Sequence, residues 1–316
     1  MPSREQSRER PKETLGLVWG ESLQWADMAK TLKARQKRAR QITGLCGLAG
    51  AFFGALSGSG FVEDGLSRLS AGGSALFLLL ATYWGREIIK PERELRWSRA
   101  RSLAEALKRE TWLCLLRVPP YDEEDAPARL EKRAEELRLN TGLERREGST
   151  AEARSELPEA ESVSDFLELR LKDQIQWYGR RADEYLKTVA RWNRIALGLG
   201  LLAAIIGGLR VLPVDAPAVA LWIPVITTAT AAIAAHLHGG RFVPFIGVYQ
   251  DTQRQVRFRL AQWEDLLAQQ KTPEKEAEFV RGCEDIMAAE NEAWRAEWMR
   301  EEKNGGVGQL AKARES

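Results

Sequence analysis

Four stretches of the chain carry no charged side chain, whereas charged residues are frequent everywhere else. The longest two, residues 41–62 and 216–240, hold 22 and 25 residues. A helix rises about 1.5 Å per residue, so either one is long enough to cross a hydrocarbon core of about 30 Å. The pattern therefore predicts membrane-spanning helices at both places.

The other two stretches are shorter and need their flanking arginines at the membrane interface. The charge-free run 69–85 lengthens to 66–85 if Arg68 extends its charge out of the lipid, and the run 195–209 lengthens to 192–212 if Arg194 and Arg210 do the same. Together the four stretches predict an all-α membrane protein with two transmembrane helical hairpins. The alternative is a soluble domain with two buried helical hairpins, since glycine and alanine dilute the hydrophobicity.

Basic residues flank both hairpins and are rare in the short connections within them. Residues 30–40 and residues 86–101 each carry six lysines or arginines, whereas residues 63–68 and residues 210–215 carry one each. Basic flanks stay on the cytoplasmic side of a membrane. We therefore expect a multi-pass protein of the inner (plasma) membrane with both termini and the long middle segment in the cytoplasm.

Small residues recur at four-residue spacing in the first and fourth spans. Such repeats let helix backbones approach closely within lipid. The predicted intramembrane packing residues are Gly47, Gly50, Gly54, Gly58, Ala231, Ala235 and Gly239. They favour a packing seam within a hairpin or between subunits, although small residues are also simply common in membrane helices. Pro224 predicts a kink near the outer end of the fourth span.

Outside the four stretches, apolar residues recur at helical spacing. Between Leu171 and Trp192 the intervals alternate between four and three, a coiled-coil-like stripe that leads into the third span. Residues 249–267 continue the pattern, and residues 279–298 repeat it behind Pro273, a residue typical of helix starts. These segments predict amphipathic cytoplasmic helices that pack on one another.

The first half of the chain has a parallel layout. Helices are expected at residues 19–40, 92–116 and 126–139, and the first two flank the first hairpin. Residues 140–164 are polar and poor in large apolar side chains, which is typical of a flexible linker. The predicted segments are a disordered leader (1–14), a first module (15–139), the linker (140–164), a second module (165–300) and a disordered tail (301–316).

The amino-acid composition narrows the classes of function to be expected. The 316 residues include 47 Lys and Arg against 45 Asp and Glu, a near balance that is unlike a dedicated nucleic-acid binder. Three cysteines (Cys46, Cys114 and Cys283) lack a disulfide or zinc spacing, and His236 and His238 are the two histidines. We expect no enzyme activity, no cofactor and no metal, because no nucleophile–base set or phosphate-binding loop occurs.

Three tracts resemble one known family. They are RWSRARSLAEALKRETW with the following PPYD, RLKDQIQWYGRRADEYLK before the third span, and FVRGCEDIMAAENEAW near the end. The chain is similar to the SLATT superfamily, the two-transmembrane effectors associated with SMODS nucleotidyltransferases and SLOG domains, and looks like two such modules in tandem. The positions that match the family motifs are Trp97, Arg101, Glu105, Trp112, Tyr178, Glu284, Glu290 and Trp294.

Two of these motif positions, Arg101 and Glu105, can be interpreted in two ways from the sequence. Arg101 and Glu105 lie four residues apart on an amphipathic helix, and an exposed pair of this kind contributes about 0.3–0.5 kcal/mol. Buried between helices, the same pair would fix the helix register, because the loss of one partner strands a charge. A site made of carboxylates alone, Glu284 with Glu290, is a further alternative.

The resemblance implies an effector of a bacterial conflict or defence system. In that interpretation the protein oligomerises in the lipid bilayer and permeabilises the inner membrane when a nucleotide signal, or a sensor protein encoded nearby, triggers it. Four spans are too few to enclose a wide pore, so several copies are needed. The alternative is a membrane-anchored helical scaffold that recruits a cytoplasmic partner without conducting.

Overall fold

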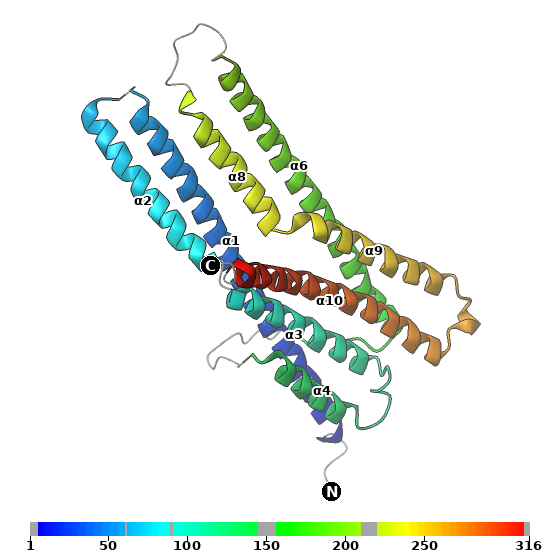
Figure 1. Cartoon of the computed structure of the whole chain (residues 1–316). Coiled ribbons are helices and arrows are strands. Elements are labelled where there is room, and N and C mark those ends of the chain that lie inside the picture. Colours follow the sequence, from blue (N-terminus) through cyan, green and yellow to red (C-terminus); the bar gives the residue numbers. More distant parts are fainter. Residues whose placement is uncertain (1–5, 61, 89–90, 144–155, 210–219, 313–316) are drawn as a thin grey trace. The chain divides into compact units, whose positions relative to one another are not determined.

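The computed structural model describes residues 6–60, 62–88, 91–143, 156–209 and 220–312. These residues form helices and connections without any strand, so the predicted all-α class is confirmed for this part of the chain (Figure 1). In chain order the elements are α1 (Gln6–Gly58), α2 (Asp64–Ile88), α3 (Pro91–Leu115), α4 (Ala126–Thr141), α5 (Val163–Phe166), η1 (Leu167–Leu171), α6 (Lys172–Leu209), α8 (Ile223–Gly239), α9 (Phe242–Glu264), η2 (Ala268–Gln270) and α10 (Pro273–Lys312).

Three helical stretches are long and apolar enough to cross a membrane. They are Lys12–Gly58, Asp64–Arg86 and Val163–Gly208, which contain the second predicted span and most of the first and third. The helix of the fourth predicted span, α8, has 17 residues, and residues 210–219 lie outside the described part. The membrane character of the chain is therefore supported, while the arrangement as two hairpins with four spans stays a prediction.

Two long helices extend beyond the predicted boundaries. The predicted helix 19–40 and the first span form one continuous helix, α1, which already begins at Gln6 within the predicted leader. At the other end α10 continues to Lys312, within the predicted disordered tail. The extension of α1 is rich in Glu, Arg, Lys and Gln, which favour helix, whereas that of α10 also contains three glycines. In both cases extending an existing helix costs far less than starting one.

Pro224 does not kink α8 as predicted. Trp222 precedes the helix as its N-cap residue, so Pro224 lies in the first turn. The backbone N–H groups of a first turn have no partner within the helix, and proline therefore costs little there. The residue marks the start of the helix.

Contacts between Cα atoms divide the chain into two compact units, each drawn from both halves of the sequence. The first, here called the helical unit, comprises residues 1–32, 91–182 and 247–316. The second, here called the apolar unit, comprises residues 33–90 and 183–246. Because α1 and α6 are continuous, each of them contributes residues to both units.

In the apolar unit, α1 and α2 pack closely at glycine. A Cβ atom added at Gly50 would lie 2.8 Å from the Leu78 side chain, and one at Gly54 would lie 3.2 Å from Ser74 Oγ. The Ser74 hydroxyl donates a hydrogen bond of 2.8 Å to the carbonyl oxygen of Gly50. At Gly47, by contrast, an added Cβ atom would have no neighbour within 4 Å.

The remaining predicted packing residues have different surroundings. Gly58 faces the chain segment just before α8, and the carbonyl oxygen of Gly239 accepts a hydrogen bond from Arg40. Ala231 and Ala235 are exposed in the single chain. The small-residue stripe of α8 therefore lies largely open in one copy of the protein.

In the helical unit, α3 lies between α4 and α10 (Figure 1). Leu103 and Leu107 of α3 are fully buried, as are Leu130 of α4 and Val280 of α10. The stripe that begins at Leu171 is buried up to Tyr185, whereas Val189 and Trp192 are only partly buried. This unit also contains most of the ionic contacts from which a functional site can be built.

Candidate functional site

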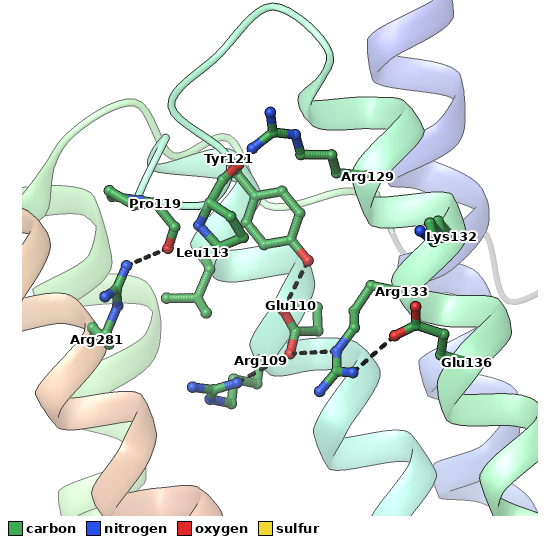
Figure 2. Close-up of a pocket in the computed structure, with 11 residues that line it drawn as sticks. Arg109, Glu110, Leu113, Pro119, Tyr121, Arg129, Lys132, Arg133, Glu136 and Arg281 are labelled. Carbon is green, nitrogen blue, oxygen red and sulfur yellow. Dashed lines mark hydrogen bonds and ion pairs between the residues drawn. The ribbon is translucent and has the colours of Figure 1, made fainter.

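A buried carboxylate organises the side of α3 that faces α4. Tyr121 Oη donates a hydrogen bond of 2.8 Å to Glu110 Oε2, and Arg109 Nη1 donates one of 3.0 Å to Glu110 Oε1 (Figure 2). Arg133 Nε of α4 lies 3.7 Å from the same Oε1. Burial, and next the charge of Glu110, raise the pKa of Tyr121, so its hydroxyl stays protonated as a donor. These four residues are called the Glu110 cluster.

A pocket of about 660 Å³ opens beside the Glu110 cluster (Figure 2). Its walls come from α3, the Pro119–Tyr121 turn, α4 and α10. The volume falls within the range of small-molecule sites. The charged residues of the lining are Arg109, Glu110, Arg129, Lys132, Arg133, Glu136 and Arg281.

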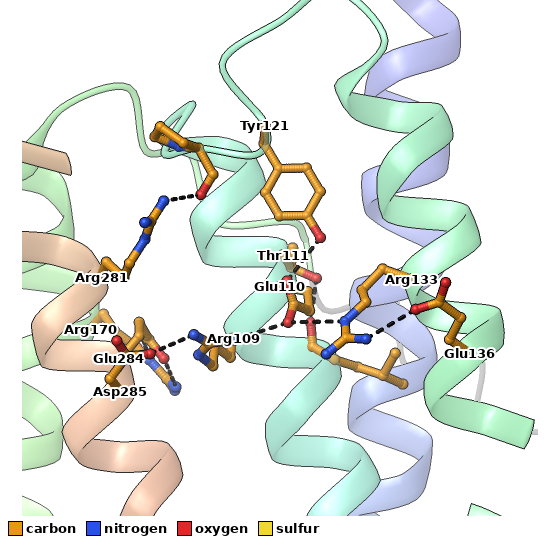
Figure 3. Close-up of polar contacts among 12 residues, drawn as sticks. Arg109, Glu110, Thr111, Tyr121, Arg133, Glu136, Arg170, Arg281, Glu284 and Asp285 are labelled. Atoms are coloured by element: carbon orange, nitrogen blue, oxygen red, sulfur yellow. Dashed lines mark hydrogen bonds and ion pairs between the residues drawn. The ribbon is translucent and has the colours of Figure 1, made fainter. Parts of the chain in front are cut away.

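A second set of charges joins η1 to α10. Arg170 Nε donates to Glu284 Oε1 at 3.0 Å and Arg170 Nη2 to Glu284 Oε2 at 3.3 Å (Figure 3). The side chains are 8% and 0% exposed, so this two-point ion pair is almost dry. Arg170 lies in η1, a π-helical turn, and such turns occur frequently at functional sites.

Arg101 forms a second ion pair with α10, at Glu290, which lies six residues after Glu284. Its Nη2 lies 3.3 Å from Oε1 of Glu290, whose side chain is 4% exposed. Glu105 instead pairs with Lys108 at 3.0 Å. The local pair expected between Arg101 and Glu105 is therefore replaced by two others, because folding brings a buried carboxylate of α10 to the arginine.

The charges of this region act on one another. Burial opposes the ionisation of Glu105, but the positive charges of Lys108, Arg170 and Arg101 outweigh it and hold its pKa below the usual value. Burial raises the pKa of Tyr178 well above its usual value, and the charges of Glu290 and Glu105 add to the effect. The ionic core is defined here as Arg101, Glu105, Arg170, Glu284 and Glu290.

The aromatic motif residues surround these charges. Trp97 and Trp112 are 3% and 2% exposed, and Trp112 lies edge-on against Phe166, with ring centroids 5.8 Å apart. Tyr178 is 3% exposed and lies 6.1 Å from the ring of Tyr249. Trp294 belongs to α10, but its side chain lies outside the described part.

Several residues of these two clusters were not singled out from the sequence. Glu110, Tyr121 and Arg170 lie inside tracts quoted for the family resemblance, whereas Arg133 had no signal of its own. The position of Arg170 among apolar residues, directly before the stripe that begins at Leu171, was the available clue, because a charge buried there needs a partner.

The arrangement is suited to holding helices together and to binding anions. Glu284 and Glu290 each have an arginine partner, which favours a structural role over the carboxylate site considered above. No group of three or more His, Cys, Asp or Glu residues suited to a metal ion occurs in the described ranges. Burial raises the pKa of Cys114 to about 11 and that of Cys283 to about 12, so both thiols stay protonated at neutral pH.

Comparison with known families identifies both halves of the chain. Residues 166–294 match SLATT_1, described as SMODS and SLOG-associating 2TM effector domain 1. Residues 23–129 match DUF4231, a family of unknown function. No curated protein and no solved structure shows a significant match. A tandem of two SLATT modules stays a prediction for the first half, whereas residues 166–294 form a domain of the SLATT family of two-transmembrane effectors.

Proposed function

We propose that the protein is an integral membrane effector of a bacterial conflict or defence system, which oligomerises and permeabilises the inner membrane when triggered. The observation that carries the proposal is the SLATT effector domain, in which one helix, α6, follows the buried Arg170 directly and continues into an apolar segment up to Leu209. A change in the ionic core would therefore act on a helix that also enters the lipid.

The proposed topology has four spans with both termini in the cytoplasm. The basic flanks support it, and the sequence that precedes α8 is also largely apolar. Cysteine substitution with a membrane-impermeant maleimide tests it on intact spheroplasts. Glu63→Cys and Asp215→Cys should react from outside, whereas Lys275→Cys should react only after lysis. Labelling of Lys275→Cys in intact spheroplasts would overturn the orientation.

The proposed subunit contact uses the exposed stripe of α8. Ala231 and Ala235 are open in the single chain, and small residues allow close helix contact in lipid. The double variant Ala231→Leu with Ala235→Leu should therefore lose cross-linked oligomers and leakage. The matched control, serine at both positions, keeps the residues small and should retain both properties.

Induced expression tests the effector role itself. The full chain should arrest growth and collapse the membrane potential, which a potential-sensitive dye reports within the same culture. The leucine double variant should accumulate in the membrane without either effect. Normal growth and potential at full expression in the native host under attack, together with a stably bound cytoplasmic partner, would favour the scaffold alternative and overturn permeabilisation.

A further inference from the structure

The pocket beside the Glu110 cluster has an unusual balance of charge. Five cationic side chains and two carboxylates line it, so the lining carries a net charge of +3. Both carboxylates are already occupied: Glu110 by Arg109, Tyr121 and Arg133, and Glu136 by Arg133 at 3.0 Å. The groups of the pocket that are still available to a ligand are therefore hydrogen-bond donors.

Three of the cations keep donors without a charged acceptor in the described residues. Lys132 is exposed and its ammonium group has no ion pair there. Arg281 donates to a neutral group, the carbonyl oxygen of Pro119 (Figure 2). Arg109 Nε is buried without an acceptor, although its terminal nitrogens bind Glu110 and Asp285. A buried N–H group without an acceptor costs free energy that a ligand oxygen can recover.

Two carboxylates at the rim, Asp125 and Glu123, would compete with a ligand for the pocket cation Arg129, but their ion pairs with it are weak. Arg129 pairs with Asp125 at 2.8 Å and with Glu123, and these side chains are 38%, 54% and 64% exposed. Exposed pairs of this type contribute only about 0–1 kcal/mol, because water and salt screen them. A phosphoryl group carries more charge and binds arginine at two points, so it can replace such a carboxylate.

We propose that this pocket binds a phosphorylated small molecule, with its phosphoryl oxygens held by Arg129, Lys132 and Arg281. The volume of about 660 Å³ accommodates a ligand of nucleotide size. Such a ligand joins α4, within the first half of the chain, to α10 of the SLATT domain. The role of the ligand as the trigger of permeabilisation rests on the proposed function, whereas the binding itself does not.

Glu110 prepares the site for the ligand. It holds Arg109 and Arg133 in place along the wall of the pocket. It also offsets their mutual repulsion while the pocket is empty. Glu110 is therefore a positioning residue, and the contacts to phosphate come from the exposed cations around it.

Calorimetric titration of the full-length protein in maltoside micelles tests the proposal, with ATP and inorganic pyrophosphate as probes. We expect saturable binding of one or both at low salt. Arg129→Ala, Lys132→Ala and Arg281→Ala should each weaken it by about tenfold or more, the factor that corresponds to about 1.4 kcal/mol for a lost charged hydrogen bond. The control Arg254→Ala removes a charge from α9 that is 78% exposed, more than the 38% of Arg129, and should leave binding unchanged.

The rim carboxylates provide a test of opposite sign. Glu123→Gln with Asp125→Asn should tighten binding, because the competing acceptors of Arg129 lose their charge. No binding of either probe, or equal weakening by Arg254→Ala, would overturn the proposal. Binding to vesicles with phosphatidylglycerol but to neither soluble probe would assign the pocket to a lipid headgroup and overturn the small-molecule class. Binding without any leakage from vesicles would instead contradict the proposed function alone.

Discussion

The guanidinium group of Arg170 is held at two points by the carboxylate of Glu284, although the two residues are 114 positions apart in the sequence. The pair closes η1 onto α10 within the helical unit. Removing two charges from water is costly, so a pair of this kind stabilises the fold only while both partners are present. Its main effect is to make one register of the two helices more stable than the neighbouring registers.

Removing one partner should therefore be far worse than removing both. Glu284→Gln or Arg170→Met should lower the free energy of unfolding by about 3–5 kcal/mol, because each leaves a polar or charged group stranded. The double variant Arg170→Met with Glu284→Met should recover most of the loss. Thermal unfolding of the detergent-solubilised full chain measures all three variants.

An exposed pair supplies the control for this cycle. Arg254 and Asp251 lie 3.3 Å apart, with side chains 78% and 61% exposed. Asp251→Asn should change stability by less than about 1 kcal/mol. Additive losses in the Arg170–Glu284 cycle would show that the two residues act independently and would contradict the coupling.

The glycine seam in the apolar unit gives a second matched comparison. Gly50→Val should destabilise the protein by about 1–3 kcal/mol, because its side chain would overlap Leu78 and push α2 away. Gly47→Val should stay within about 0.5 kcal/mol, since an added Cβ atom there has no neighbour within 4 Å. Midpoints of thermal aggregation in detergent distinguish them, and equal effects would contradict the seam.

Local features of the helices were predictable from the sequence. The helix expected at residues 92–116 is α3, Pro91–Leu115, and that expected at 126–139 is α4, Ala126–Thr141. Pro273 begins α10 as expected. These boundaries follow from periodicity and from the backbone chemistry of proline, which act over a few residues and need no knowledge of the fold.

The partners of the charged residues were not predictable in the same way. Arg101 had Glu105 as its visible neighbour one turn away, yet folding gives it Glu290, 189 positions further along. A single sequence contains no measure of which distant helices meet, so ion pairs between helices stay invisible. The pocket was missed for the same reason, since its cations come from the consecutive helices α3 and α4 and from the distant α10.

The buried thiols should report on the integrity of the helical unit. Because the pKa of Cys114 is raised to about 11 and that of Cys283 to about 12, few thiolates exist at neutral pH, and the thiolate is the reactive form. In a Cys46→Ser variant neither thiol should react with an aromatic disulfide reagent until denaturant is added, when both should react. Rapid reaction of the native variant would contradict the burial of both groups.

Acid should weaken the helical unit through Glu105. Its pKa lies below the ordinary value of 4.5 in the folded chain, chiefly because Lys108, Arg170 and Arg101 outweigh the effect of burial. The folded state thus binds fewer protons than the unfolded state, so this contribution is complete above about pH 4.5 and is lost as pH falls through the lowered pKa. The stability difference between the native sequence and Glu105→Gln, followed by chemical denaturation from neutral to acidic pH, should therefore shrink on acidification. Repeating the comparison in a Lys108→Met background, where the strongest of the three charges is absent, should give a smaller pH dependence, and a difference that grows toward low pH would contradict the assigned sign.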